Sequence, residues 1–122
     1  MKQYKIINAY KIIQDIEKKD KEYPLTISHA IFKVKRALQD QWDFQIAEEQ
    51  KIFAKYHPKQ LEDGRFQVDS EELGAEWMDK LTQLSNMDVD IDYSKPQIRI
   101  TDDVGLTVRE VDALSDFVDF IE

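Results

Sequence analysis

The longest uninterrupted stretch of the sequence runs from Leu25 to His57 and reads LTISHAIFKVKRALQDQWDFQIAEEQKIFAKYH. It holds neither Gly nor Pro, and its apolar residues recur every three or four positions, which is the spacing of one helix face. Those residues are Ile27, Ile31, Val34 and Leu38, followed by Trp42, Ile46, Phe53 and Tyr56. A helix of about 30 residues is about 45 Å long, more than the width of a compact domain of this size. We therefore expect it to pair with other helices along its length, or with another copy of the chain.

The residues before this stretch predict a shorter helix that folds back against the long one. Ile6, Tyr10 and Ile13 follow helical spacing between Gln3 and Asp20. Pro24 then breaks the helical pattern. Because the connection to the long helix is short, the two helices should form a helical hairpin.

A third helix is predicted after Pro58, which ends the long helix. Asp63-Gly64 is a turn signal, and the alternation around Phe66 predicts a very short strand or extended link. Asp69 is the expected N-cap of the third helix, with Glu72 completing a capping box. Its apolar stripe consists of Leu73, Trp77, Leu81 and Leu84.

The hydrophobic period changes from helical to alternating at residue 88. In residues 88–93 one strand face holds Val89, Ile91 and Tyr93, and the other holds Asp88, Asp90 and Asp92. Ile98 and Ile100 alternate in the same way after a turn signal at Ser94-Lys95-Pro96. This pattern predicts a β-hairpin with one buried face.

A last helix should begin at Thr107, with Glu110 in a capping box. Its stripe consists of Val111, Leu114, Phe117, Val118 and Ile121. The expected fold class is α+β and mostly helical: a helical hairpin with one long helix, a third helix, a β-hairpin and a C-terminal helix. The 122 residues fit one domain, residues 1–122.

The charge of the chain is unevenly distributed. The net charge is −8, but residues 1–61 hold 12 basic and 8 acidic residues, whereas residues 62–122 hold 5 basic and 17 acidic residues. Such polarity suits contacts between complementary surfaces, including those of two copies. An acidic chain is a poor nucleic-acid binder, so we expect no direct nucleic-acid binding. Apolar runs of two or three residues exclude a membrane span, and the first ten residues lack the features of a signal peptide.

No residue pattern points to catalysis, a cofactor or a metal ion. The chain has no Cys, which excludes disulfides and thiolate sites. Asp88, Asp90 and Asp92 suggest a cation site, but a calcium loop needs Gly at its sixth and Glu at its twelfth position, where this chain has Tyr93 and Arg99. The two histidines lie roughly 40 Å apart on the long helix. We therefore expect a protein that is not an enzyme, with no catalytic, cofactor-binding or metal-binding residues.

Four aromatic residues of the long helix are the candidate partner contacts. They are Trp42, Phe44, Phe53 and Tyr56. Packing in the core is the competing explanation for each of them. Trp42 and Phe44 lie on different sides of the helix, so they should not both contact the same narrow partner.

The order of these motifs resembles that of small uncharacterised proteins of phages and prophages of low-GC Gram-positive bacteria. The similarity rests on residues 5–10 (KIINAY), the long helix, the Asp63-Gly64 turn, residues 81–87 (LTQLSNM), residues 89–91 and residues 114–117 (LSDF). These motifs are structural and not chemical. The resemblance implies a viral assembly or accessory role, in the cytoplasm of the bacterial host or associated with the virion.

Two classes of function follow. The first is a non-catalytic structural, assembly or accessory protein that acts through helix-mediated protein–protein contacts, including self-association as a homodimer. The second is a host-directed inhibitor whose acidic C-terminal half occupies a basic, nucleic-acid-binding surface of another protein.

Overall fold

The computed structural model describes residues 1–68, 70–91, 93–101 and 104–122. In these ranges the helices are α1 (Gln3–Lys18), α2 (Leu25–Tyr56), α3 (Glu71–Ser85) and α4 (Val108–Leu114). The strands are β1 (Lys59–Gln60), β2 (Phe66–Gln67), β3 (Gln97–Arg99) and β4 (Asp119–Ile121). The predicted class, α+β and mostly helical, is confirmed.

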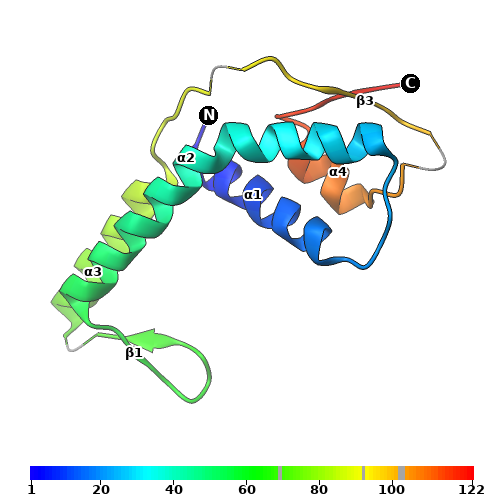
Figure 1. Ribbon diagram of the computed structural model, residues 1–122. Coiled ribbons are helices and arrows are strands. Elements are labelled where there is room, and N and C mark those ends of the chain that lie inside the picture. Colours follow the sequence, from blue (N-terminus) through cyan, green and yellow to red (C-terminus); the bar gives the residue numbers. More distant parts are fainter. Residues whose placement is uncertain (69, 92, 102–103) are drawn as a thin grey trace.

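The elements form two parts, which we call the body and the arm (Figure 1). The body consists of α1, residues 25–45 of α2, α4, β3 and β4. The arm consists of residues 46–56 of α2, the strands β1 and β2, and α3, and it extends away from the body (Figure 1). The long helix α2 is therefore common to both parts.

The predicted helical hairpin of α1 and α2 is present. The Pro24 carbonyl accepts hydrogen bonds from the amides of Ile27 and Ser28, both at 3.0 Å, and so starts α2. At the other end His57 has a left-handed backbone (φ 46°), and its amide caps the Phe53 carbonyl. Pro58 follows and cannot continue the helix.

The hydrophobic core lies in the body, where α1 packs against α2 and α4. Its largest fully enclosed apolar side chains are Ile6, Ile13, Leu38, Ile98, Leu114 and Phe117. They come from α1, α2, β3 and the C-terminal segment, so the two ends of the sequence are held together by one apolar cluster.

The predicted hairpin at residues 88–101 is wrong. β3 pairs in parallel with β4, with Ile98 opposite Phe120. The described residues of 88–93 instead meet the N-terminus, because the Val89 amide donates to the Met1 carbonyl at 2.8 Å and Asp88 bridges Lys2. Alternation identifies the buried face of a strand, but it does not identify the strand's hydrogen-bonding partner.

The predicted last helix ends earlier than expected. The capping box of Thr107 and Glu110 is confirmed, but α4 stops at Leu114, and β4 follows at Asp119. Phe117 and Val118 are both buried in the core, although they lie between the helix and the strand. These two apolar residues have helical spacing, but they reach the core from a turn that precedes a short strand and not from a longer helix.

The arm contains an antiparallel hairpin that the sequence indicated only in part. β1 pairs with β2 around the predicted Asp63-Gly64 turn, where Gly64 has φ +86° and Leu61 donates to the Arg65 carbonyl at 2.7 Å. α3 follows, and its N-cap is Ser70, whose side chain accepts from the Leu73 amide. The predicted cap, Asp69, lies outside the described residues.

Gln3 is completely buried where the body meets the arm. Its amide donates to the Met87 carbonyl at 2.9 Å, and its side chain donates to the carbonyl of Gln41 and to Oε1 of Gln45. A side chain bonded to a helix carbonyl competes with that carbonyl's own helix partner. This contact accompanies the change of direction visible about midway along α2 (Figure 1).

Candidate protein-interaction surface

The arm buries much less of its apolar surface than the body does. Tyr56 of α2 and Leu84 of α3 are buried. In contrast, Phe53 is 52% exposed, Phe66 45% and Met78 55%. A contiguous apolar patch of this kind on a small protein is typical of an interaction site.

Three aromatic side chains from three elements form what we call the aromatic row: Phe53 of α2, Phe66 of β2 and Trp77 of α3. The rings of Phe53 and Phe66 meet edge to face with centroids 6.4 Å apart, and those of Phe66 and Trp77 meet at 6.3 Å. Edge-to-face contacts of this length are favourable and fix the relative orientation of the rings. The row therefore holds the hairpin and α3 against α2 while leaving part of each outer ring in solvent.

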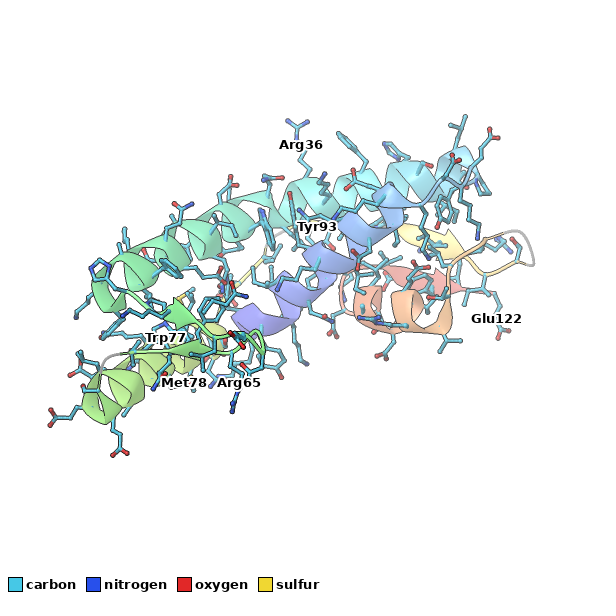
Figure 2. All side chains as sticks on the ribbon, turned by 90° about the horizontal axis from the view of Figure 1, so that it is seen from below. Arg36, Arg65, Trp77, Met78, Tyr93 and Glu122 are labelled. Carbon is cyan, nitrogen blue, oxygen red and sulfur yellow. The ribbon has the colours of Figure 1, made fainter. Side chains whose placement is uncertain are left out.

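A shallow depression continues the row along α3. Its volume is about 470 Å³, and Phe66, Val68, Trp77 and Met78 form its apolar lining. Figure 2 shows Trp77 and Met78 beside each other on α3, near Arg65 of the hairpin. The arm thus presents an apolar face with a recess for a partner's side chain.

Tyr56 anchors α2 to α3 from the inside of the arm. Its ring is buried, and its hydroxyl donates to a carboxylate oxygen of Glu76 at 3.3 Å. The Lys55 ammonium lies 5.2 Å from the centre of the same ring. Tyr56 therefore contributes to the packing of the arm and not to its surface.

The structure separates the four predicted contact residues. Trp42 is half-buried and stacks on Tyr10 with ring centroids 4.5 Å apart, and Tyr56 is buried, so both pack inside the molecule. Phe44 is exposed on α2 outside the aromatic row, and Phe53 belongs to the row.

Sequence reasoning placed Phe66 in a very short strand or extended link and Trp77 in the apolar stripe of the third helix, but it did not bring the two together, so it missed two members of the row. The available signal was the Asp63-Gly64 turn between two short extended runs. A hairpin closed by this turn folds its second strand back toward the end of α2, where Phe53 lies.

Acidic side chains border the apolar face of the arm. The exposed carboxylates of α3 are those of Glu71, Glu72, Glu76 and Asp79, and Lys80 is the one basic residue of this helix. A partner that covers the row must therefore tolerate or complement negative charge at its rim.

The described part of the chain holds no cluster of side chains suited to a metal ion. Within it, no three His, Asp or Glu side chains come close enough to hold a metal ion. Asp88 forms an ion pair with Lys2 at 3.2 Å, Asp90 is exposed, and Asp92 lies outside the described residues. His29 and His57 lie at opposite ends of α2. None of the helices described has the length and apolar content needed to cross a membrane.

The one buried carboxylate identified in the described residues has a structural role. Glu110 is buried beside Lys19, whose ammonium lies 2.7 Å from it, and its other oxygen accepts from the Thr107 amide at 2.8 Å. Burial alone would raise the pKa of the Glu110 carboxyl, but these hydrogen bonds and the Lys19 charge outweigh burial and lower the pKa. The pair fastens α4 to the end of α1.

Comparison with known proteins identified no relative of this chain. No family model matches the chain, and the comparisons with curated proteins and with solved structures found no match.

Proposed function

We propose that this chain is a non-catalytic structural, assembly or accessory protein of a phage or prophage, and that it acts through protein–protein contacts of its helical arm. The phage assignment rests on the motif resemblance given with the sequence. The same resemblance implies that the protein acts in the cytoplasm of the bacterial host or on the virion. The mode of action rests on the geometry of the arm.

The observation that carries the proposal is the exposed aromatic row. Aromatic and Met side chains are enriched at the centres of protein interfaces because they bury a large area at a small cost in side-chain entropy. Phe66 contacts Phe53 and Trp77 and lines one depression with Trp77 and Met78. These side chains lie on the arm, away from the core. A surface built for solubility alone does not require this grouping.

We propose a second copy of the chain as the first occupant of this face, in a homodimer. Two arms packed side by side would cover both aromatic rows with like apolar surface. They would also cover the part of the C-terminal half of α2 that α3 and the hairpin leave exposed. No direct nucleic-acid or membrane contact is part of the proposal.

Light scattering on the purified chain at micromolar concentration tests this proposal. The wild type should have the mass of a dimer, and Phe66→Ser with Met78→Ser should reduce it to a monomer. Leu25→Ser and Val108→Ser are the matched controls, because both remove highly exposed apolar side chains from the body. They should leave the dimer intact.

A wild type that is monomeric throughout this concentration range would contradict self-association. If the two control variants dissociate the dimer as fully as the arm variant does, the contact does not lie on the arm.

The exposed carboxylates of α3 favour a second candidate function: a host-directed inhibitor whose acidic C-terminal half occupies a basic, nucleic-acid-binding surface of another protein. Replacing Glu71, Glu72, Glu76 and Asp79 by Gln distinguishes this inhibitor from an assembly protein that acts through the apolar face of the arm. An apolar arm contact should survive the change or become tighter, whereas binding to a basic surface of another protein should be lost.

A further inference from the structure

The arm is joined to the body at two places along the chain. The first is the bend about midway along α2 (Figure 1). The second follows the end of α3 at Ser85, where residues 86–89 return to the body beside the N-terminal segment. There the Lys2 ammonium donates to the Asn86 carbonyl at 3.1 Å. The direction of the arm, and of the aromatic row on it, is therefore set at these two connections.

Gln3 contacts both connections. Its backbone amide donates to the Met87 carbonyl at 2.9 Å, just beyond the end of α3. Its side-chain amide donates to the Gln41 carbonyl at 3.2 Å and to Oε1 of Gln45 at 3.3 Å, both on α2. One residue of α1 thus holds together the two segments that carry the arm.

The contact with the Gln41 carbonyl accounts for the bend of α2. In a straight α-helix this carbonyl accepts from the amide four residues later, which is that of Gln45. A side chain that inserts into the helix hydrogen bonds is one of the few causes of a sharp kink, and Pro and Gly are two others. Because α2 contains neither Pro nor Gly, the Gln3 side chain is the cause that the described residues supply.

The packing of Gln3 alone does not explain why a polar side chain lies here. Gln3 is completely enclosed, yet its Oε1 has no hydrogen-bond partner within the described part of the chain. An unpaired buried amide oxygen opposes folding, whereas an apolar side chain of similar length would avoid that loss. The two bonds to α2 are what an apolar side chain could not supply.

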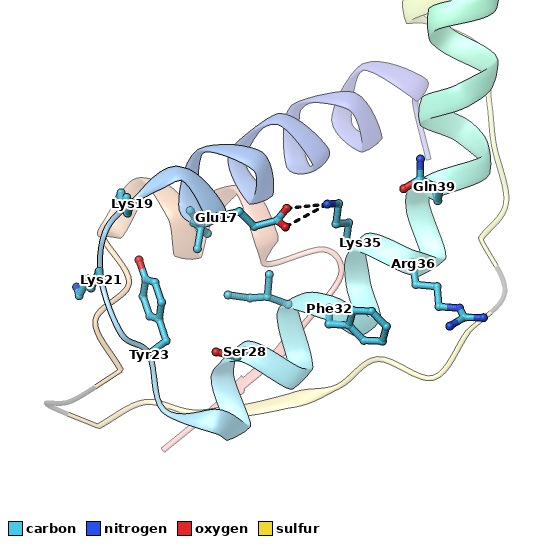
Figure 3. Close-up of a pocket in the computed structure, with 11 residues that line it drawn as sticks. Glu17, Lys19, Lys21, Tyr23, Ser28, Phe32, Lys35, Arg36 and Gln39 are labelled. Atoms are coloured by element: carbon cyan, nitrogen blue, oxygen red, sulfur yellow. Dashed lines mark hydrogen bonds and ion pairs between the residues drawn. The ribbon is translucent and has the colours of Figure 1, made fainter.

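The body half of α2 is tied to α1 by direct bonds as well as by the core. The Lys35 ammonium bonds both carboxylate oxygens of Glu17, at 2.8 and 3.1 Å (Figure 3), and the Tyr10 hydroxyl donates to Gln39 at 2.7 Å. Between α1 and the arm, in contrast, lies a depression of about 270 Å³ with a mostly polar lining. Apolar packing that would oppose a turn of the arm is therefore sparse on this side.

We propose that the joint between body and arm is a hinge, and that Gln3 is the positioning residue that holds it bent. When the Gln3 side chain leaves α2, the Gln41 carbonyl regains its helix partner and α2 straightens. The end of α3 then turns about residues 85–87. The aromatic row takes a second direction relative to the body, whatever the identity of the partner that covers it.

Distances between pairs of spin labels test the proposal. The chain has no Cys, so labels can be attached through Lys18→Cys in α1 and Lys33→Cys in α2, each paired with Glu72→Cys in α3. All three positions are exposed. An excess of unlabelled chain ensures that only distances within one molecule are measured. The Lys18–Lys33 pair lies wholly in the body and is the internal reference.

Gln3→Met removes both side-chain bonds to α2 and keeps the length of the side chain. A kink of about 20°, carried along about 15 residues of helix, moves the end of the arm by about 8 Å. At least one of the two body–arm distances should therefore shift by about 3 Å or more, while the reference distance stays the same.

Two further variants assign the effect. Gln45→Met removes one of the two contacts and should move the arm in the same direction by a smaller amount, which also decides the matter if Gln3→Met does not fold. Gln39→Met is the matched control, because it removes hydrogen bonds from α2 within the body and not at the joint. It should leave both body–arm distances unchanged.

Unchanged body–arm distances in Gln3→Met and Gln45→Met would overturn the proposal. So would a distribution that only broadens about the wild-type distance, since Gln3 would then restrain the arm without setting its angle. An equal shift in Gln39→Met would show that the angle is not set at the joint. None of these results depends on the oligomeric state that the arm variants test.

Discussion

The body and the arm are built on the same helix, α2, but they cover its apolar stripe differently. In the body, α1 and β3 pack against the first half of α2, α4 packs against α1, and Val34 and Leu38 are completely enclosed. In the arm, α3 and a hairpin of two-residue strands are the neighbours, and Phe53 remains half exposed. The apolar residues of one amphipathic helix therefore belong to the hydrophobic core at its N-terminal end and are partly exposed to solvent at its C-terminal end.

The difference shows that the number of neighbouring elements decides whether an apolar side chain becomes core. Burial needs atoms on all sides, and two packed helices with a short hairpin cannot enclose a stripe that three or four elements enclose in the body. We therefore expect the arm to have the lower local stability, and it leaves more apolar surface exposed than the body does. Measurements that compare the two parts test this division.

Leu38→Ala should give the largest loss of stability. Leu38 is fully buried, so truncation leaves a cavity, and the free energy of unfolding should fall by about 2–5 kcal/mol. Urea denaturation followed by circular dichroism measures the loss. A loss below about 1 kcal/mol would mean that the body is not the main source of stability.

Trp77→Ala should cost less, about 1–3 kcal/mol, because its ring is half-buried and meets Phe66 only at an edge. The loss should be local. Hydrogen exchange should quicken in α3 and the hairpin, whereas amides of α1 keep their protection. Equal loss of protection in α1 would show that body and arm unfold as one cooperative unit.

Glu110→Gln should cost about 1–2 kcal/mol at pH 7, because it removes the charge of a buried capping side chain. The pKa of Glu110 is lowered in the folded state from its ordinary value of 4.5, so this stabilisation is complete above that pH and is lost as the pH falls further. Melting temperatures of the two proteins should therefore converge in acid. Asp112→Asn, an exposed change in α4, is the control and should show no such convergence.

The helices could be predicted from the sequence because their signals are local. Pro24 and Pro58 mark the limits of α2, and the spacing of its apolar residues identifies its buried face. The capping box at Thr107 identified the start of α4 correctly. Each of these features depends on residues a few positions apart.

The partners of the strands could not be predicted, because they depend on distant residues. Ile98 alternates with polar neighbours whether its strand pairs with residues 88–93 or with β4. Phe117 and Val118 fit a helical stripe, yet a turn buries them equally well. The aromatic row depends on the same kind of information, since its members come from three elements.

A groove between the link after α1 and the first half of α2 was not predicted for a related reason. Its four basic residues lie in that link (Lys19 and Lys21) and on α2 (Lys35 and Arg36), where each one suits an exposed helix face or a helix end. Only the packing of α1 against α2 brings them into the lining of one groove. The uneven charge of the chain indicated a basic half, but it did not locate the groove.

Asp90→Asn should have the smallest effect, within about 0.5 kcal/mol of the wild type and on the stabilising side. Asp90 is exposed, and its neighbour Asp88 is already paired with Lys2, so neutralising Asp90 removes repulsion and no ligand. Calorimetry with calcium or magnesium should show no binding to either protein. Asp88→Asn is the informative comparison, because it breaks the pair that holds the N-terminus and should melt slightly below Asp90→Asn. A fall in melting temperature for Asp90→Asn, together with a loss of measurable cation binding, would show that these aspartates form a site, and that this site lies outside the arm.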